Sequence, residues 1–499
     1  MRHFFKWLGI GLLTLICLIL LAAGGLLGWM KWAGDRDWKR VQAELQAKGE
    51  KLTFAELIPP PPPDDQNFFA DPLWMQLTDL VPVKNKNEEG VEVTSWEPRL
   101  PAKELLINQG NTPLTNTEKM RLKAFLPKSE EAYPPDRSDF RLLNRELRTT
   151  TDPVRRKLFA QLILDLMQPA SPMLAKITEL SKRPSAYFPL RYQDIEKGAI
   201  IGCHNEVLKL GQLLNTKCMA ELILNNVEAA FTDIHSLASL ASAQGSQPLL
   251  IYHLIRLSVV SMALNNINVG IEHHQWTDAQ LAGFQTMLKN NDLADDLCFT
   301  LRGERIFANH MDYSTSVGHS PMGIFFNLVL SYSKPAHSSL MQDAIEKLQS
   351  NKSTGVNVTT SLFEQRLKEI HADPLKNLLY HMETLALPTL YGAIEKTIEV
   401  QTQIYQTIIA CALERFRIAH GFYPASLDAL IPEYLVAIPK EPTTGEPMHY
   451  RLEPEGKFLL WAPGWNLKTL GGKRGEFKRD GDIVWNQKLP TQSRETAKP

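Results

Sequence analysis

The sequence predicts a mainly α-helical protein: an N-terminal transmembrane helix, an irregular α-helical body, and a small α+β module at the C-terminus with a short antiparallel sheet. Three observations lead to this fold class. Residues 8–30 carry no charged side chain. Residues 138–388 repeat apolar side chains at helical spacing almost throughout. Residues 389–486 begin as a long helix and end in short strand-like runs between turn residues.

The composition limits the functions that the chain can have. Its 499 residues suffice for two or three domains, and a hydrophobic fraction of 44% allows a buried core. Lys and Arg number 54 against 55 Asp and Glu, so the net charge is −1. A nearly neutral chain has no field that gathers nucleic acid or acidic substrates, and we expect no nucleic-acid partner.

The first element is the apolar segment 8–30, which follows a short basic N-terminus, 1–7. These 23 residues, at about 1.5 Å rise each, span about 34 Å and can cross a hydrocarbon core of about 30 Å. A cleaved signal peptide would have a shorter apolar run. Indole rings favour the headgroup level of a bilayer, and three tryptophans flank the segment: Trp7, Trp29 and Trp32. Residues 8–30 are therefore predicted to lie in a lipid bilayer.

Two arguments give opposite orientations for this helix. Two basic residues precede it and four follow it closely, and this count of Lys and Arg places the body in the cytoplasm. A short basic N-terminus before a long apolar helix, however, ordinarily stays inside while the rest of the chain is exported. We favour export, which gives a single-pass protein of the bacterial inner membrane with a periplasmic body.

The segment 31–137 is predicted to contain three parts. Residues 35–48 form a juxtamembrane helix that continues the anchor and closes at Gly49. The five prolines 59–63 form a semi-rigid polyproline II spacer between the membrane and the body. The remainder, interrupted by prolines, is expected to be irregular, with a capping box at Thr115 and Glu118 that starts one helix.

The body 138–388 carries several helix start signals. Asp or Ser followed by Pro predicts a first turn, and Thr followed three residues later by Gln predicts a capping box. These signals occur at Asp152, Ser171, Thr277 and Asp373. Pro388 is expected to interrupt or kink the helix that follows Asp373.

Two long apolar runs, 219–241 and 249–267, are predicted to form central helices of the body because Leu, Ile and Ala occupy several of their sides. Charged residues within both runs argue against a second membrane span: Glu221, Glu228, Asp233 and Arg256.

The C-terminal module 389–486 has the most distinctive order of elements. A helix over 390–420 ends at Gly421, and a short helical turn follows at 426–431. Three strands are then expected, with turn residues 453–456 after the first: 448–452, 458–461 and 482–485. Residues 487–499 are predicted to be a disordered tail.

This order resembles the soluble domain of the major pseudopilin of type II secretion systems, over about the last hundred residues. The matching residues are 412–417, Gly421, Tyr423, Pro424, Leu427, Leu430, Pro439, Pro442, Gly445, Tyr450, Asp482, Ile483 and Trp485. The whole layout, with the run from Leu57 through the prolines to Phe69, also resembles a group of uncharacterised bacterial single-anchor membrane proteins. Neither resemblance implies a chemical activity.

Departures from the pseudopilin pattern matter for function. Pseudopilins begin with a prepilin-peptidase motif of Gly, Phe, Thr, Leu, Ile and Glu, which is absent here, so we do not expect a fibre subunit. The calcium loop of that family corresponds to 464–482, where lysines and an arginine crowd in positive charge. Asp480 and Asp482 are therefore predicted to be a poor calcium site.

Two serine motifs suggest a hydrolase, and both are incomplete. Residues 318–323 place Ser320 within one residue of a G-x-S-x-G elbow, whose tight turn does not accommodate an extra residue. Ser331 and Lys334 form an S-x-x-K pair, but Pro335 is expected to end its helix at once, and residues 352–355 resemble K-T-G only loosely.

The histidines and cysteines also lack a complete motif. His273 and His274 are adjacent, but no H-E-x-x-H is present, and His204 with Glu206 lacks the P-C-x-x-C partner of deaminases. A further histidine group comprises His310, His319 and His337. The body cysteines form no C-x-x-C pair and are expected to be small buried residues, with a Cys203–Cys218 disulfide left open: Cys203, Cys218, Cys298 and Cys411.

The sequence predicts no catalytic, cofactor-binding or metal-binding site. It predicts a membrane-anchored, exported protein that acts by binding or assembly at the cell envelope. Its partners are the bilayer, through residues 8–30, and an envelope protein. Two alternatives remain: an envelope hydrolase that uses Ser320 or a histidine cluster, and an accessory factor of a type II secretion-like machine.

Overall fold

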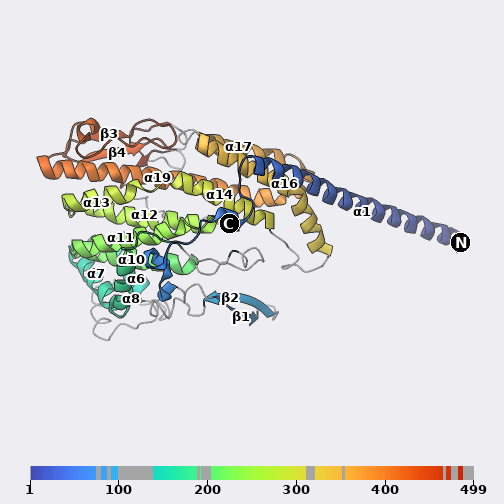
Figure 1. Cartoon of the computed structure of the whole chain (residues 1–499), viewed down its shortest axis with the longest axis horizontal. Helices are drawn as coiled ribbons and strands as arrows, with labels where there is room; N and C mark the ends of the chain where they lie inside the picture. The colour runs from blue at the N-terminus through green and yellow to red at the C-terminus, as the bar shows by residue number, and fades with distance from the viewer. Residues whose placement is uncertain are drawn as a thin grey trace.

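The computed structural model is mainly helical, with a small three-stranded antiparallel sheet. It describes residues 2–74, 80–86, 92–98, 139–187, 192, 204–310, 321–350, 355–464, 468–473 and 481–486. The helices stack side by side, and one long helix extends away from the stack toward the N-terminus (Figure 1).

The extended helix is α1, Arg2–Ala47, so the predicted anchor and juxtamembrane helix form one continuous element. It ends as predicted, because Gly49 adopts a φ of +75° and the Gly49 and Glu50 amides bond the last-turn carbonyls. The C-terminal part of α1 packs on the body. There Met30, Val41 and Leu45 are buried, and the helix packs against α16, Pro321–Ser350.

The helical body is built by neighbours packing in succession. α7 packs on α10, α10 on α11 and α12, α12 on α19, and α19 on α13, while α14, α16 and α17 form the part that meets α1 (Figure 1). The bounds are α6 Asp139–Thr149, α7 Pro153–Met167, α8 Ser171–Leu180, α10 His204–Ile223, α11 Val227–Gln244, α12 Leu250–Glu272, α13 Asp278–Lys289, α14 Leu293–His310, α17 Gly355–His371, α18 Pro374–Leu379 and α19 His381–His420.

The core has two clusters of buried side chains. The larger follows α7 to α13 and the C-terminal part of α19, with Tyr252, Phe284 and Ile404 among its members. The smaller joins α14, α16, α17 and the first half of α19, with Leu301 and Phe363 at its centre. α12 is long and apolar enough to cross a membrane, but 67% of its most apolar stretch is buried. It is a core helix, as predicted for 249–267.

The local start signals of the body are confirmed. Asp152 accepts hydrogen bonds from the amides of Val154 and Arg155 at the start of α7. Thr277 and Gln280 form a complete capping box at α13, and Asp373 caps α18. α8 begins at Ser171, as expected. The capping box predicted at Thr115 lies outside the described residues.

Three helix predictions are wrong. The run 219–241 is two helices, because α10 ends at Ile223 and Asn225, with a φ of +63°, turns the chain before α11. Pro335 lies inside α16, so it does not end that helix, and Pro388 lies inside α19 without interrupting it, while the alternative of a kink at Pro388 stays a prediction. Each proline removes one amide donor, but the flanking turns remain packed in the smaller core. The domain boundary predicted at 388 therefore falls within α19.

The segment expected to be irregular contains a hairpin. β1, Leu80–Lys86, pairs antiparallel with β2, Glu92–Pro98, and Val83 lies opposite Ser95. The prolines in these strands misled the prediction. Proline is tolerated on an edge strand, and a two-stranded ribbon has only edges.

The polyproline run does not separate the body from α1, which corrects the spacer prediction. α1 already packs on α16 upstream of the run, and α2, Phe54–Leu57, contacts α14. Downstream, η1, Asp64–Gln66, and η2, Phe68–Ala70, bring Phe68 and Trp74 into the large core. The prolines thus cross the body surface from α14 toward α11.

The C-terminal elements follow the predicted order. α19 ends at Gly421, whose φ is +85°, and η5, Leu427–Leu430, follows. β3, His449–Leu452, β4, Phe458–Ala462, and β5, Ile483–Val484, form an antiparallel sheet in the order β3-β4-β5. Along the long axis of the molecule, this sheet and the N-terminus lie toward opposite ends (Figure 1). The tail 487–499 is outside the described residues.

Candidate functional site

The junction between α1 and α16 is a close backbone contact. A Cβ atom placed on Gly34 would lie 2.5 Å from the carbonyl oxygen of Ser331, so only glycine fits there. Five residues before Gly34, the Trp29 ring lies 5.9 Å from the Tyr332 ring, and four residues after Gly34 the Trp38 ring meets α16. These contacts fix where α1 leaves the body.

A buried ion cluster holds the end of α1 on α14. Glu50 accepts hydrogen bonds from Arg302 Nε at 2.9 Å and from Arg305 Nη2 at 2.8 Å, and Arg305 is fully buried. Burial acts to raise the pKa of Glu50, but the hydrogen bonds and charges of the two arginines lower it to about 2. Gln342 of α16 bonds Arg305 as well, so three helices meet at this cluster.

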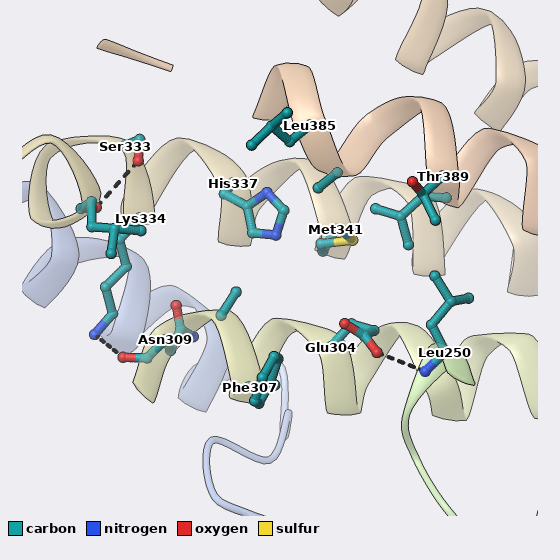
Figure 2. Close-up of a pocket in the computed structure, with 14 residues that line it drawn as sticks. Leu250, Glu304, Phe307, Asn309, Ser333, Lys334, His337, Met341, Leu385 and Thr389 are labelled. Atoms are coloured by element: carbon teal, nitrogen blue, oxygen red, sulfur yellow. Dashed lines mark hydrogen bonds between the residues drawn. The ribbon is translucent and has the colours of Figure 1, made fainter. Parts of the chain in front are cut away.

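A cavity of about 280 Å³ lies between α14, α16 and α19. The α16 residues that line it are close in sequence to those that contact α1. Its walls are mainly apolar, and Figure 2 shows α14 and α16 facing one another across it with α19 above. Leu385, on α19, lines the cavity and is 58% exposed, which places the opening on that side.

Polar side chains project into this apolar space. Glu304 lines it and accepts a hydrogen bond from the Leu250 amide at 2.6 Å; burial raises the pKa of Glu304 to about 7. His337 is 8% exposed, burial lowers its pKa to about 4, and no described residue bonds its Nδ1. His337 is therefore uncharged at neutral pH, whereas Glu304 is protonated below about pH 7 and ionised above it.

Lys334 is the cationic residue that lines the cavity. Its ammonium donates to the Asn309 carbonyl oxygen at 2.8 Å and lies 4.3 Å from the centroid of the Trp38 ring. Burial lowers the pKa of Lys334. Its charge is thus directed toward α1 and the end of α14, away from the apolar walls (Figure 2).

The candidate hydrolase residues are not assembled in the described part of the chain. Ser320, His319 and residues 352–354 lie outside it. Lys334, from the S-x-x-K pair, is engaged by Asn309 and Trp38. His204 and Glu206 lie in the first turn of α10, and their side chains are outside the described ones.

The predicted histidine group is dispersed. His310 Nδ1 is 2.8 Å from the Ile306 carbonyl oxygen, His274 bonds the buried carboxylate of Glu414 at 2.9 Å, and His273 is exposed. No described residues form a group of three or more His, Cys, Asp or Glu side chains that could hold a metal ion. Of the described histidines, His337 lines the cavity.

The cysteines of the body that are described are buried free thiols, as expected: Cys218, Cys298 and Cys411. Burial raises the pKa of Cys218, and its Sγ lies 3.5 Å from the Ala230 carbonyl oxygen. Because Cys218 is free, the disulfide left open with Cys203 is not formed; Cys203 itself is outside the described residues.

Asp482 has a structural role in its loop. Its carboxylate accepts hydrogen bonds from the amides of Leu470 and Gly472, the latter at 2.7 Å, and lies 3.2 Å from the Thr469 hydroxyl. The side chain is 3% exposed. Its oxygens are therefore already engaged, while Asp480 lies outside the described residues.

Sequence reasoning singled out His337 and Lys334 within other motifs, but it missed Glu304 and the cavity itself, although a signal was present. Glu304 interrupts an apolar stripe on α14, between Leu301 and Ala308, and His337 interrupts one on α16, between Leu330 and Met341. A polar residue on an apolar helical face marks a buried site when a cavity lies beside it.

The fold and the site define a mainly helical protein with a small C-terminal sheet and a pocket between three helices. Comparison of the chain with protein families, with curated proteins and with solved structures finds no match.

Proposed function

We propose that this chain is a membrane-anchored protein whose helical body acts by binding at the cell envelope, with residues 8–30 of α1 in the bilayer. One observation carries the proposal. From Leu13 to Leu26 the described leucine and isoleucine side chains of α1 are strongly exposed, at 63% for Leu13, 63% for Leu18 and 72% for Leu21, and the N-terminal part of α1 extends away from the body (Figure 1). Apolar exposure of this extent along a helical segment fits a lipid environment.

The two ends of the exposed part support the same proposal. Trp7 is 74% exposed at one end, and Trp29 and Trp32 are 52% and 58% exposed at the other. Charged residues begin directly after it, where Lys31 pairs with Asp35 at 2.7 Å. An apolar helix bounded by indole rings and then by charges matches the profile of a bilayer.

The rigid junction gives the anchor a second role. Because Gly34 and Glu50 fix α1 on α16 and α14, a helix held in lipid would also set the orientation of the body. The proposed location is the bacterial inner membrane with the body in the periplasm. The C-terminal sheet, toward the opposite end of the long axis, would then face away from the bilayer.

Membrane fractionation tests this proposal. Full-length protein should remain with membranes after alkaline carbonate washing, and a Leu18→Arg, Leu21→Arg double variant should be released in larger amount, since each Arg at a helix centre costs about 2.5–3.5 kcal/mol of insertion free energy. Recovery of intact full-length protein in the soluble fraction would contradict it. Protease added to spheroplasts should degrade the body; protection until lysis would place it in the cytoplasm.

A second role is supported by the C-terminal unit. A long helix ending at Gly421, followed by the β3-β4-β5 sheet, has the order of elements expected from the pseudopilin resemblance. Two apolar residues near it are strongly exposed, Phe422 at 62% and Val436 at 84%. We propose that this surface engages a component of a type II secretion-like assembly.

Photo-crosslinking in membranes tests this role. A benzophenone amino acid at Val436 should capture a pseudopilus component, whereas one at Glu455, exposed in the β3–β4 turn, serves as the matched control. Capture of no such component from either position would contradict the role.

A further inference from the structure

We propose that the cavity between α14, α16 and α19 binds an uncharged single-chain amphiphile, an alkyl or acyl chain with a hydroxyl or amide head. The membrane anchoring proposed above supplies only the source of such molecules. The binding site itself depends on the cavity and its polar groups, so the two proposals can fail separately.

The size and walls of the cavity fit a short chain. An apolar cavity of about 150 Å³ admits benzene, so about 280 Å³ has room for a chain of roughly ten carbon atoms. Phe307, Leu330, Met341 and Leu390 line it, and the exposed Leu385 stands at its rim. An apolar chain that enters such a cavity leaves water without displacing a polar contact of the protein.

His337 shows where the head group would bind. Its Nδ1 is buried, lacks a hydrogen-bond partner among the described residues and belongs to a side chain that lines the cavity. A buried polar atom without a partner is costly, and a ligand that bonds it removes this cost. In Figure 2 the imidazole hangs from α16 into the space above α14.

Glu304 supplies a second polar contact across the cavity from His337 (Figure 2). One of its oxygens accepts a hydrogen bond from the Leu250 amide, and no described residue donates a hydrogen bond to the other oxygen. A neutral imidazole has one donor and one acceptor, and a protonated carboxyl can donate. A hydroxyl or amide, which both donates and accepts, matches these two groups.

The charges of the site select an uncharged head. His337 is neutral at pH 7, and Lys334 is engaged by the Asn309 carbonyl and the Trp38 ring. Below pH 7, where Glu304 is protonated, a charged ligand would lose its hydration and find no free counter-ion in the described lining of the cavity. Alcohols and amides lose much less hydration free energy on entering the cavity.

The position of the cavity indicates the source of the chain. α16 lines the cavity and also packs on α1, where Tyr332 meets Trp29 and Lys334 meets Trp38. The cavity therefore lies at the part of the body that holds α1 (Figure 1). Single-chain molecules dissolved in the bilayer are the nearest supply.

Photo-labelling of the full-length protein in lipid nanodiscs tests the proposal. The probe is a decanol analogue with a diazirine in its chain, compared with the matching carboxylate and trimethylammonium analogues at pH 6, where Glu304 is mostly protonated. The alcohol should label peptides of α14 and α16 about tenfold more than either charged probe, and excess decanol should compete. Labelling confined to α1, or stronger labelling of α14 and α16 by a charged probe, would overturn it.

Two variants separate the cavity from nonspecific labelling. Ala386→Trp fills the cavity and should reduce labelling about tenfold. Ile324→Trp adds the same ring to an exposed position of α16 and should label like the wild type. Wild-type labelling of a folded Ala386→Trp would overturn the proposal.

His337→Leu tests whether His337 binds the head group of the ligand. If Ala386→Trp has no cooperative thermal transition and so does not fold, His337→Leu becomes the test of the whole proposal. It keeps a side chain of similar volume and removes both nitrogens. The preference for the alcohol over the charged probes should fall to near equality. An unchanged preference would overturn the assignment.

Discussion

The ammonium of Lys334, on α16, lies 4.3 Å from the ring centroid of Trp38, on α1, and the same lysine lines the cavity. Its hydrogen bond to the Asn309 carbonyl adds the end of α14 to this contact. One residue therefore connects the position of the anchor helix with one wall of the pocket. Substitutions at the α1 junction, in the cavity and in the C-terminal loop are expected to change stability in different ways.

Gly34→Ala should destabilise the protein, whereas Gly28→Ala, the same change in the same helix, should not. A Cβ at Gly34 would meet the Ser331 carbonyl oxygen at 2.5 Å, but one at Gly28 meets nothing within 4 Å. We expect a loss of about 1–3 kcal/mol for the first variant, from forced separation of α1 and α16. Thermal unfolding of the full-length protein measures both. Equal transition temperatures would show that the helices do not touch there.

Glu50→Gln should lower the free energy of unfolding by about 2–4 kcal/mol, because it leaves the buried Arg305 without its counter-ion. The folded pKa of Glu50, about 2, is lower than its unfolded value, so its contribution is present above pH 4.5 and is lost as the pH falls toward 2. The difference between variant and wild type should shrink over that range. Glu346→Gln is the control, since its pair with Lys48 is exposed and contributes less than about 1 kcal/mol.

Glu304→Gln should stabilise the protein at high pH. Burial raises the folded pKa of Glu304 to about 7, so the unfolded chain releases the proton first, and stability is lost as the pH rises from 4.5 through 7. Gln keeps the acceptor for the Leu250 amide and has no charge to bury. We expect the variant to match the wild type near pH 4 and to exceed it by about 1–3 kcal/mol at pH 8. If denaturant titrations gave the same difference in stability between variant and wild type at every pH across this range, the raised pKa of Glu304 would be contradicted.

Calcium should not stabilise the C-terminal loop, and Asp482→Asn should destabilise it. The carboxylate already accepts the amide hydrogens of Leu470 and Gly472, and Asn retains only one acceptor oxygen. We expect a loss of about 1–2 kcal/mol in the variant and no shift of the wild-type transition between calcium and EDTA. A calcium-dependent increase in wild type that disappears in the variant would show a cation site instead.

Elements with local signals were predictable from the sequence. Asp152, Thr277 and Gly421 act through hydrogen bonds or backbone angles within a few residues, and the helix ends that they mark are confirmed. The helix ends predicted at Pro335 and Pro388 were wrong because packing in the smaller core stabilises helical turns that a proline ring would weaken in isolation. Tertiary contacts are not visible in a local pattern.

The cavity was not predictable, for the same reason. Leu250, Glu304, His337 and Leu385 come from four helices, and their separations in the sequence reach more than a hundred residues. The stripes of α14 and α16 show that polar residues occupy apolar faces, but not that those faces meet with space between them. The position of α16 between α1 and the cavity is likewise a result of packing.

A depth measurement on Cys17 is the sharpest test of the proposed membrane anchor. Cys17 is exposed near the middle of residues 8–30, whereas Cys218, Cys298 and Cys411 are buried, so a nitroxide label on a Cys203→Ser variant reports from one site. In lipid bilayers we expect the label to collide readily with oxygen and rarely with a water-soluble nickel chelate. Ready collision with the nickel chelate, in correctly folded full-length protein, would contradict a lipid-embedded α1.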